Sequence, residues 1–117
     1  MKKAIILFLL LVSCKQEKPG IYLVDKPQFE ALIEKEYLVL DVRTPKEFTS
    51  GAIENAVNMD YNAPDFRQKI DSLPKDKPVL VYCGSGVRSA LAVKVMDSLG
   101  FQTVYDLKGG YLKWLGY

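Results

Sequence analysis

Hydrophobic residues in this chain form two kinds of stretch that alternate along the sequence. Short continuous apolar runs are typical of strands buried on both faces of a parallel sheet, and longer stretches with helical spacing predict helices with one apolar face. Such alternation indicates a three-layer α/β domain with a central, mostly parallel five-stranded sheet flanked by helices. The predicted strands are residues 21–24, 37–41, 56–58, 79–82 and 104–107, and helices are expected to begin near residues 25, 44, 66, 89 and 111.

Local signals mark several of these boundaries. Residues 44–47, Thr-Pro-Lys-Glu, combine a Thr N-cap, a Pro in the first helical position and a Glu in the third, and they predict a capping box. The most regular helical pattern is residues 89–99, and Gly100 follows it at the place of a C-terminal cap. The pair Gly109-Gly110 predicts a turn before the last helix.

The first 14 residues predict an export signal rather than a part of the fold. Two lysines precede nine apolar residues, Ala4 to Val12, and Ser13-Cys14 follow. A membrane span needs roughly 20 apolar residues, so this run is too short for one. Leu11 to Cys14, LVSC, resembles the lipobox of bacterial lipoproteins, which implies cleavage before Cys14 and acylation of that residue. Plain secretion, with Cys14 left as an unmodified thiol, is the alternative.

These signals divide the chain into residues 1–13 as signal peptide, residues 14–20 as lipidated cysteine and polar tether, and residues 21–117 as one folded domain. The expected location is outside the cytoplasm, with a lipid anchor in a bacterial membrane and the domain in the periplasm or at the cell surface. Several acyl chains on one residue anchor firmly, whereas a single chain binds marginally. We expect a monomer.

Charge and composition exclude several classes of function. The formal net charge of the 117 residues is +2, and the charged residues form no basic stripe of the kind that nucleic acid binding requires. The sequence contains no histidine, so mechanisms with an imidazole base, a histidine metal ligand or a Cys-His pair are excluded. We expect neither a cofactor nor a metal.

The candidate chemistry lies at Cys83, directly after the strand 79–82. In open α/β sheets, ligands bind beyond the carboxyl ends of the strands. The loop Gly84, Ser85, Gly86, Val87 and Arg88 can turn several amides inward as an anion-binding nest, supported by the dipole of the following helix and the charge of Arg88. Such surroundings favour a thiolate near neutral pH and so a nucleophile. The alternative is a buried structural cysteine that packs as a small hydrophobe.

Three motifs resemble the rhodanese family. Residues 83–89, CGSGVRS, are similar to its active-site loop, C-x-x-G-x-R-[SA]; residues 40–48, LDVRTPKEF, are similar to its upstream motif; and residues 107–114, LKGGYLKW, are similar to its closing motif. The resemblance covers nearly all of residues 21–117. It implies a parallel sheet flanked by helices and a sulfurtransferase that forms a persulfide on Cys83. It also implies two small-molecule partners, a sulfur anion or persulfide donor and a thiol or cyanide acceptor, with the amides of residues 84–88 holding the outer sulfur.

The sequence departs from the family pattern at two positions. Ala52 stands where the upstream motif commonly has a histidine, and Gly84 stands where members that use thiosulfate often have Arg or Lys. The second difference leaves Arg88 as the only cation of the loop and weakens the case for thiosulfate as natural donor. Three charged residues of the upstream motif are interpreted as an ion-pair and capping network that fixes the turn rather than as catalytic groups: Asp41, Arg43 and Glu47. Tyr82 and Trp114 are interpreted as core aromatics.

Three other functions remain to be separated from sulfur transfer. Cysteine-dependent phosphatases and arsenate reductases use the spacing C-x5-R, but here the spacing is C-x4-R, which gives a loop better suited to one sulfur than to a phosphate. A partner-binding module of the rhodanese type typically lacks the nucleophile, which this chain keeps. A thiol redox role would need a second thiol from a partner, because Cys83 is the only cysteine of the predicted domain.

Overall fold

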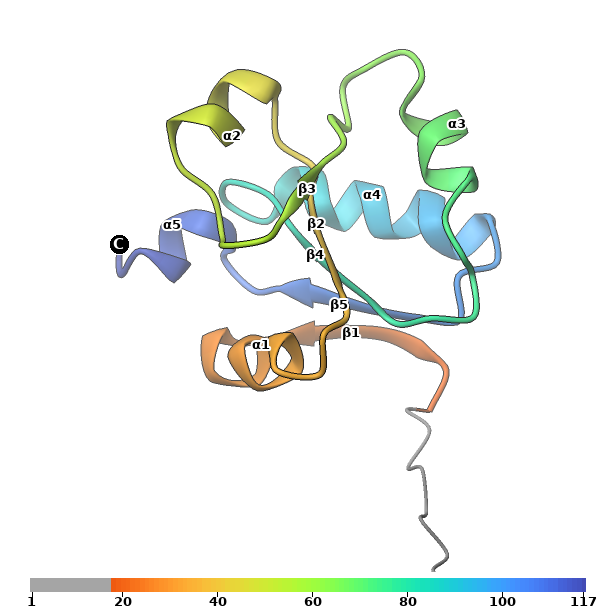
Figure 1. The fold of residues 1–117 in the computed structure, drawn as a ribbon, viewed down its shortest axis with the longest axis horizontal. Helices are drawn as coiled ribbons and strands as arrows, with labels where there is room; N and C mark the ends of the chain where they lie inside the picture. Colours follow the sequence, from red (N-terminus) through yellow and green to blue (C-terminus); the bar gives the residue numbers. More distant parts are fainter. Residues whose placement is uncertain (1–17) are drawn as a thin grey trace, which may run out of the picture.

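The computed structural model describes residues 18–117, in which five strands alternate with five helices. The elements, coloured along the chain in Figure 1, are β1 Gly20–Val24, α1 Lys26–Ile33, β2 Leu38–Asp41, α2 Pro45–Ser50, β3 Val57–Asn58, α3 Phe66–Asp71, β4 Val79–Tyr82, α4 Val87–Ser98, β5 Thr103–Leu107 and α5 Gly110–Trp114. The predicted signal peptide and Cys14 lie outside the described residues.

All strand pairs in the sheet are parallel, and the strand order is β1-β5-β4-β2-β3. The predicted three-layer α/β fold with a five-stranded parallel sheet is therefore confirmed. The chain first passes from β1 across to β2 and β3, and then returns to β4 in the middle of the sheet. This reversal places β4 between β2 and β5, and the carboxyl ends of these three strands meet at one edge, where α/β sheets bind ligands.

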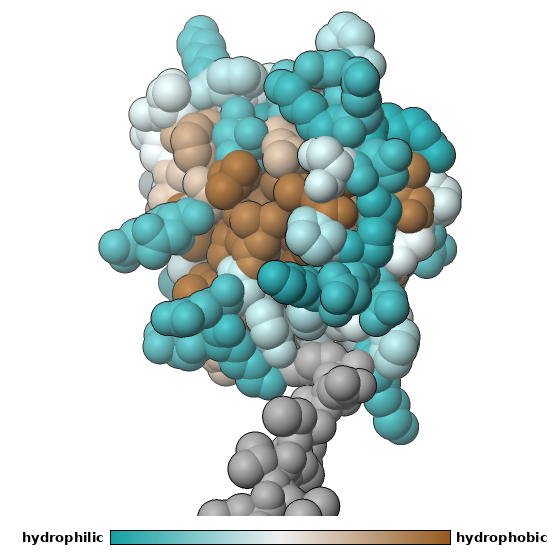
Figure 2. Space-filling model, turned by 45° about the vertical axis from the view of Figure 1, so that its right-hand side comes forward, coloured by the Kyte–Doolittle hydropathy of each residue, from teal (hydrophilic) through white to brown (hydrophobic). Residues whose placement is uncertain are grey.

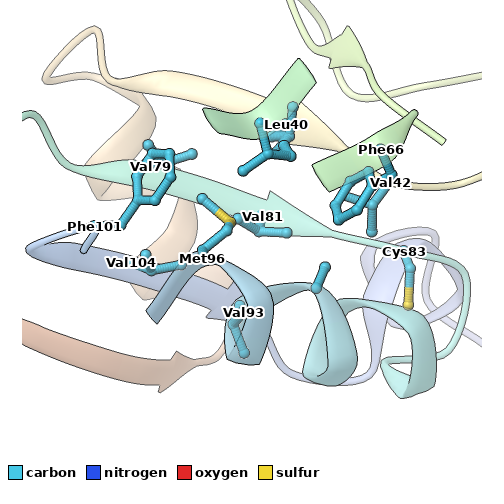
Figure 3. Packing of buried hydrophobic residues seen from close by; sticks show 12 residues of the cluster. Leu40, Val42, Phe66, Val79, Val81, Cys83, Val93, Met96, Phe101 and Val104 are labelled. Atoms are coloured by element: carbon cyan, nitrogen blue, oxygen red, sulfur yellow. The ribbon is translucent and has the colours of Figure 1, made fainter. Parts of the chain in front are cut away.

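Two apolar layers hold the helices against the sheet. One cluster joins the sheet to α3 and α4 and contains Leu40, Val81, Met96 and, at its end, Cys83 (Figure 3). The other cluster lies on the opposite face, where Phe29 of α1 and Tyr82 of β4 pack with Trp114 of α5 at its border. Side chains alternate between the two faces along each strand, so a strand with both faces covered is apolar throughout. This explains why β4 is a continuous apolar run.

Several boundaries differ from the sequence predictions by one or two residues. The first strand begins at Gly20, the second at Leu38, and the third is limited to Val57–Asn58. The helix expected from residue 89 begins at Val87, because Gly86 takes a left-handed conformation (φ +104°) and ends the loop early. The earlier start places Arg88 inside the first turn of α4 rather than in the loop before it.

The surface of the domain is mixed in polarity. Figure 2 shows a group of hydrophobic side chains in the middle of one face, surrounded by hydrophilic ones. Exposed apolar residues are normal on folded domains, since polar groups are too few to cover the whole surface. Among the helices of residues 18–117, none has the length and hydrophobicity needed to cross a bilayer.

Candidate active site

Cys83 stands at the carboxyl end of the central strand β4, and its side chain points toward α4 (Figure 3). The backbone N–H of Gly86 donates to Sγ at 3.1 Å, and the thiol donates to the hydroxyl of Ser89 at 3.4 Å. Cys83 is fully buried, with 0% of its surface exposed. The sulfur therefore lies between the loop above it and the first turn of α4, within reach of two polar groups.

The N-terminus of α4 carries no side-chain cap. The first amides of a helix have no partner within the helix and are normally satisfied by a capping side chain or by water. Here Gly86 N–H is directed to the sulfur, and within residues 18–117 no protein acceptor is found for the amides of Val87 and Arg88. Free amides at the positive end of a twelve-residue helix form a favourable place for an anion.

Helix α5 fixes the backbone of the cysteine loop from outside. Tyr111 N–H donates to the carbonyl of Cys83 at 2.8 Å, and Leu112 N–H donates to that of Gly84 at 3.0 Å. In a trans peptide the carbonyl and the following N–H point in opposite directions. Holding these two carbonyls against α5 therefore turns the N–H groups of Gly84 and Ser85 away from α5, toward the inside of the loop.

This contact between α5 and the loop depends on glycine at position 110. A Cβ atom on Gly110 would lie 2.6 Å from the carbonyl oxygens of both Cys83 and Gly84, and the residue has a φ of +61°. A side chain would therefore separate α5 from the loop. The sequence pattern predicts only a turn at Gly109-Gly110 and not this close contact, for which two adjacent glycines directly before a helix are the available signal.

Arg88, the cation in the first turn of α4, is already paired. The Arg88 guanidinium donates to both carboxylate oxygens of Glu47, at 2.7 and 2.9 Å, across the gap between α4 and α2. Hydrogen bonding from Arg88 is the main cause that lowers the pKa of Glu47 to about 2, with Thr44 adding to it against the effect of burial. A Cβ atom at Gly84 would lie 3.1 Å from the Arg88 Nη2 atom, so glycine there leaves room for the pair.

Asp41, Arg43 and Glu47 do not form a single network. Arg43 donates to both oxygens of Asp41, at 2.7 to 3.1 Å, and both residues are buried. Arg43 also donates to the carbonyl of Gly51 at 2.7 Å. Glu47 instead caps α2 through Thr44 and pairs with Arg88, because α2 turns its carboxylate toward the neighbouring loop.

The aromatic residues Tyr82 and Tyr111 enclose the Arg43 side chain. Its guanidinium lies 4.4 Å from the centre of the Tyr111 ring and 5.6 Å from that of Tyr82. Burial is the main cause that raises the pKa of Tyr82, with its hydrogen bond to Asp41 adding to the shift. Tyr82 is fully buried and Trp114 is partly buried at the edge of the core, as expected of core aromatics.

A surface hollow of about 280 Å³ lies over the loop. Gly84, Ser85 and Arg88 form one side of it, and Tyr111 and Leu112 of α5 form another. A second hollow has a volume of about 300 Å³. Arg43, Glu47 and Tyr111 line both hollows, and Lys46 lines only the second of the two. Cys83 lines neither hollow, so a small molecule held there contacts the loop backbone before it meets the sulfur.

Comparison with known proteins assigns a family to most of the chain. The sequence profile of the family described as "Rhodanese-like domain" matches residues 25–117. A protein named sulfurtransferase from Allochromatium vinosum is 34% identical over 80 residues, which cover 68% of this chain and 73% of that protein. A tRNA uridine(34) hydroxylase from Pelagibacter ubique is 35% identical over 116 residues, covering 97% of this chain; the chain spans 38% of that protein's length.

The fold has a similar counterpart among solved structures. The crystal structure of a rhodanese-related protein from Thermoplasma volcanium superposes with a TM-score of 0.72 at 36% sequence identity. The match covers 82% of this chain and 94% of that one.

Proposed function

The chain belongs to the rhodanese-like family, and from this membership we propose that it is a sulfurtransferase that carries sulfur as a persulfide on Cys83. The observation that carries the proposal is the position of Sγ at the uncapped N-terminus of α4, with Gly86 N–H donating to it. A backbone N–H that already donates to the sulfur stabilises negative charge on it without rearrangement, as preorganised donors do in electrostatic catalysis.

The proposed reaction has two displacement steps. The Cys83 thiolate attacks the outer sulfur of the donor, a new S–S bond forms, and the old bond breaks with its electron pair leaving on sulfite or on a thiolate. The acceptor thiolate or cyanide then attacks the outer sulfur of the Cys83 persulfide and regenerates the Cys83 thiolate. The sulfane sulfur is passed on without a change in overall redox state, so the cycle needs no external oxidant or reductant.

Burial of Cys83 sets a requirement for this cycle. The carbonyls of residues 83 and 84 are held by α5, whereas Ser85 at the tip of the loop is exposed. The tip therefore has to move aside for the donor and for the acceptor. The same burial favours one alternative function, a non-catalytic module that binds a partner through the loop surface.

The pairing of Arg88 with Glu47 affects which sulfur donor the site prefers. A cation held by a carboxylate at 2.7 Å has little attraction left for a dianion such as thiosulfate. A persulfide or polysulfide presents its outer sulfur with less charge, so we propose these as the preferred donors. Glu47→Gln removes the competing charge and should raise kcat/KM for thiosulfate relative to a persulfide, by roughly tenfold. An unchanged ratio would contradict this assignment.

The central test is the mass of the purified full-length protein after incubation with glutathione persulfide, inorganic polysulfide or thiosulfate. A persulfide adds about 32 Da, which tandem mass spectrometry should locate on Cys83, and added cyanide or thiol should remove it. Cys83→Ser should gain no such mass, and Ser85→Ala, at the exposed tip, is the matched control that should still load. Absence of loading with all three donors would favour the binding module.

We also propose that the protein is exported and held at a bacterial membrane by acylation of Cys14. The support is the LVSC segment behind nine apolar residues. Membrane fractionation of cells that express the full chain should place the wild type with membranes, and Cys14→Ser should be released or remain uncleaved. Wild-type protein recovered in soluble form without lipid would contradict the anchor.

A further inference from the structure

The hollow lined by Lys46 adjoins the hollow over the cysteine loop. Arg43, Glu47 and Tyr111 line both, so the two hollows share one wall. Lys46, in the first turn of α2, lines only the second hollow, whereas Ser85 at the tip of the loop lines only the first. A molecule that contacts both the loop tip and the lysine therefore has to extend through both hollows. The proposed sulfur cycle uses only the hollow over the loop.

The second hollow carries one unpaired positive charge. Arg43 is paired with Asp41 at 2.7 Å. Glu47, the carboxylate of the shared wall, is paired with Arg88 at 2.7 Å. Lys46 is exposed, and in the described part of the chain it has no carboxylate partner. Because the charges of the two ion pairs cancel, the lysine determines the net charge that a ligand meets in this hollow, and this charge favours an anion.

Tyr111 adds a hydroxyl group to the second hollow. A Cβ atom on Gly51, which also lines this hollow, would lie 3.1 Å from the Tyr111 Oη atom, so the phenol end of the ring reaches this side of the shared wall. The hydroxyl group has no hydrogen-bond partner among residues 18–117. A phenol O–H and an ammonium group are both donors, and a carboxylate accepts from such groups through its two oxygens.

We propose that the second hollow binds the carboxylate of the small thiol that accepts sulfur from Cys83, and that Lys46 selects such an anionic acceptor. The thiol end of the molecule lies over the loop, and a chain of several bonds leads to its carboxylate beside the lysine. In the transfer step the acceptor thiolate attacks the outer sulfur of the persulfide, and the Cys83 thiolate leaves. The carboxylate keeps its charge and forms no covalent bond, so Lys46 is a binding residue and not a catalytic one.

The shape of the site separates this acceptor from compact sulfur compounds. Thiosulfate and inorganic polysulfide have no side arm, so one of them placed over the loop leaves the second hollow empty. A mercapto acid fills both hollows and gains an ion pair with Lys46. The inference rests on the proposed sulfurtransferase function for the identity of the thiol, whereas the affinity of the second hollow for a carboxylate is independent of sulfur transfer.

Binding is tested with the S-methyl derivative of ω-mercaptohexanoate, which keeps the carboxylate but has no reactive thiol, and with the corresponding amide, which has the same length and no charge. In NMR titrations of the full-length protein, the acid should bind about threefold more tightly than the amide, the effect of one exposed ion pair, and should shift the backbone signals of Lys46 and Tyr111. Lys46→Gln should remove this preference, and Lys46→Glu should reverse it. Lys113→Gln is the matched control, because Lys113 is exposed on the neighbouring α5 and lines neither hollow.

The rate of sulfur transfer provides the second measurement. Protein loaded with inorganic polysulfide is mixed with ω-mercaptohexanoate or with its amide, and loss of the added mass of about 32 Da is followed over time. The ratio of the two rate constants cancels the intrinsic reactivities of the thiols when variants are compared. This ratio should fall about threefold in Lys46→Gln and stay at the wild-type value in Lys113→Gln. Salt at about 0.5 M should lower the wild-type ratio, because it screens an exposed ion pair.

Two results would overturn the proposal: equal binding of the acid and the amide by the wild type, or equal losses of preference in Lys46→Gln and Lys113→Gln. The second result would indicate a general effect of surface charge rather than a binding site in the hollow. A protein that loads no sulfur but binds the acid through Lys46 would refute the proposed function and leave the carboxylate site intact. Normal loading of sulfur, with the same rate ratio in the wild type and Lys46→Gln, would refute the carboxylate site alone.

Discussion

Two strand-to-helix turns lie side by side at the carboxyl edge of the sheet, one after β2 and one after β4. The turn after β2 is closed by its own side chains: Thr44 accepts from Glu47 N–H at 3.2 Å, and Glu47 accepts from Thr44 N–H at 3.4 Å. The turn after β4 has no such cap, and its Gly86 N–H is directed to the sulfur of Cys83. The two turns thus differ in whether their polar backbone groups are already satisfied.

The comparison shows why charged residues are a poor guide to chemistry in this domain. The turn after β2 carries more charged side chains, but Asp41 and Arg43 satisfy each other and hold the turn together. The turn after β4 is rich in glycine, and within residues 18–117 the amides of Val87 and Arg88 have no protein acceptor. Substitutions in the first turn should therefore reduce stability, and substitutions around the second should reduce activity.

Asp41→Ala should have the largest effect on stability. It leaves the Arg43 guanidinium buried at 5% exposure without its carboxylate, and loss of one partner of a buried pair costs about 3–5 kcal/mol. Urea unfolding at pH 7 measures the loss. Asp71→Ala, which breaks the exposed pair with Lys75, is the control and should change stability by less than about 1 kcal/mol. Equal losses would contradict the conclusion that the buried pair of Asp41 and Arg43 holds the turn after β2 together.

Gly110→Ala should mainly reduce activity. Its Cβ atom would lie 2.6 Å from two loop carbonyls, so α5 has to move away and the amides of the loop lose their orientation. Loss of one oriented donor typically lowers the rate by about 10²–10³-fold, and a similar loss of sulfur transfer is expected. Gly116→Ala is the control, because Gly116 also has a positive φ, +94°, but nothing lies within 4 Å of its Cβ position. Comparable activity losses would indicate backbone strain rather than displacement of the loop.

Thr44→Ala should destabilise the domain by about 1 kcal/mol, the usual value of a side-chain N-cap, and leave sulfur transfer per folded molecule nearly unchanged. Thr49→Ala removes a similar hydroxyl from an exposed position in the same helix and should cost less. Thermal unfolding of the two variants gives the difference. A large activity loss in Thr44→Ala would show that the capped turn also takes part in the chemistry.

Glu47→Gln should have the smallest effect on stability, visible as a change in pH dependence. The pKa of Glu47 is about 2 in the folded chain against 4.5 ordinarily, so its ionised form stabilises the fold above pH 4.5 and this contribution is lost as pH falls toward 2. The wild type should exceed Glu47→Gln in unfolding free energy at pH 6, and the gap should narrow between pH 5 and pH 2. A gap that stays constant would contradict the ion pair with Arg88.

Features that depend on neighbouring residues were accessible from the sequence. The capping box at Thr44 and the strand before Cys83 follow from local patterns, and both are confirmed by the structure. The partners that shape the site were not accessible, because they come from distant elements: Glu47 reaches Arg88, and Tyr111 reaches the carbonyl of Cys83.

The hydrogen bonds from α5 to the cysteine loop also bear on how the protein is made. The ribosome produces Cys83 before Tyr111 and Leu112, and domains generally fold as units. Until α5 docks, the carbonyls of Cys83 and Gly84 lack their partners on Tyr111 and Leu112. Docking of the last helix then fixes the backbone of the cysteine loop at these two points. Biosynthesis thus leaves an interval in which the loop lacks the orientation that it has in the finished domain.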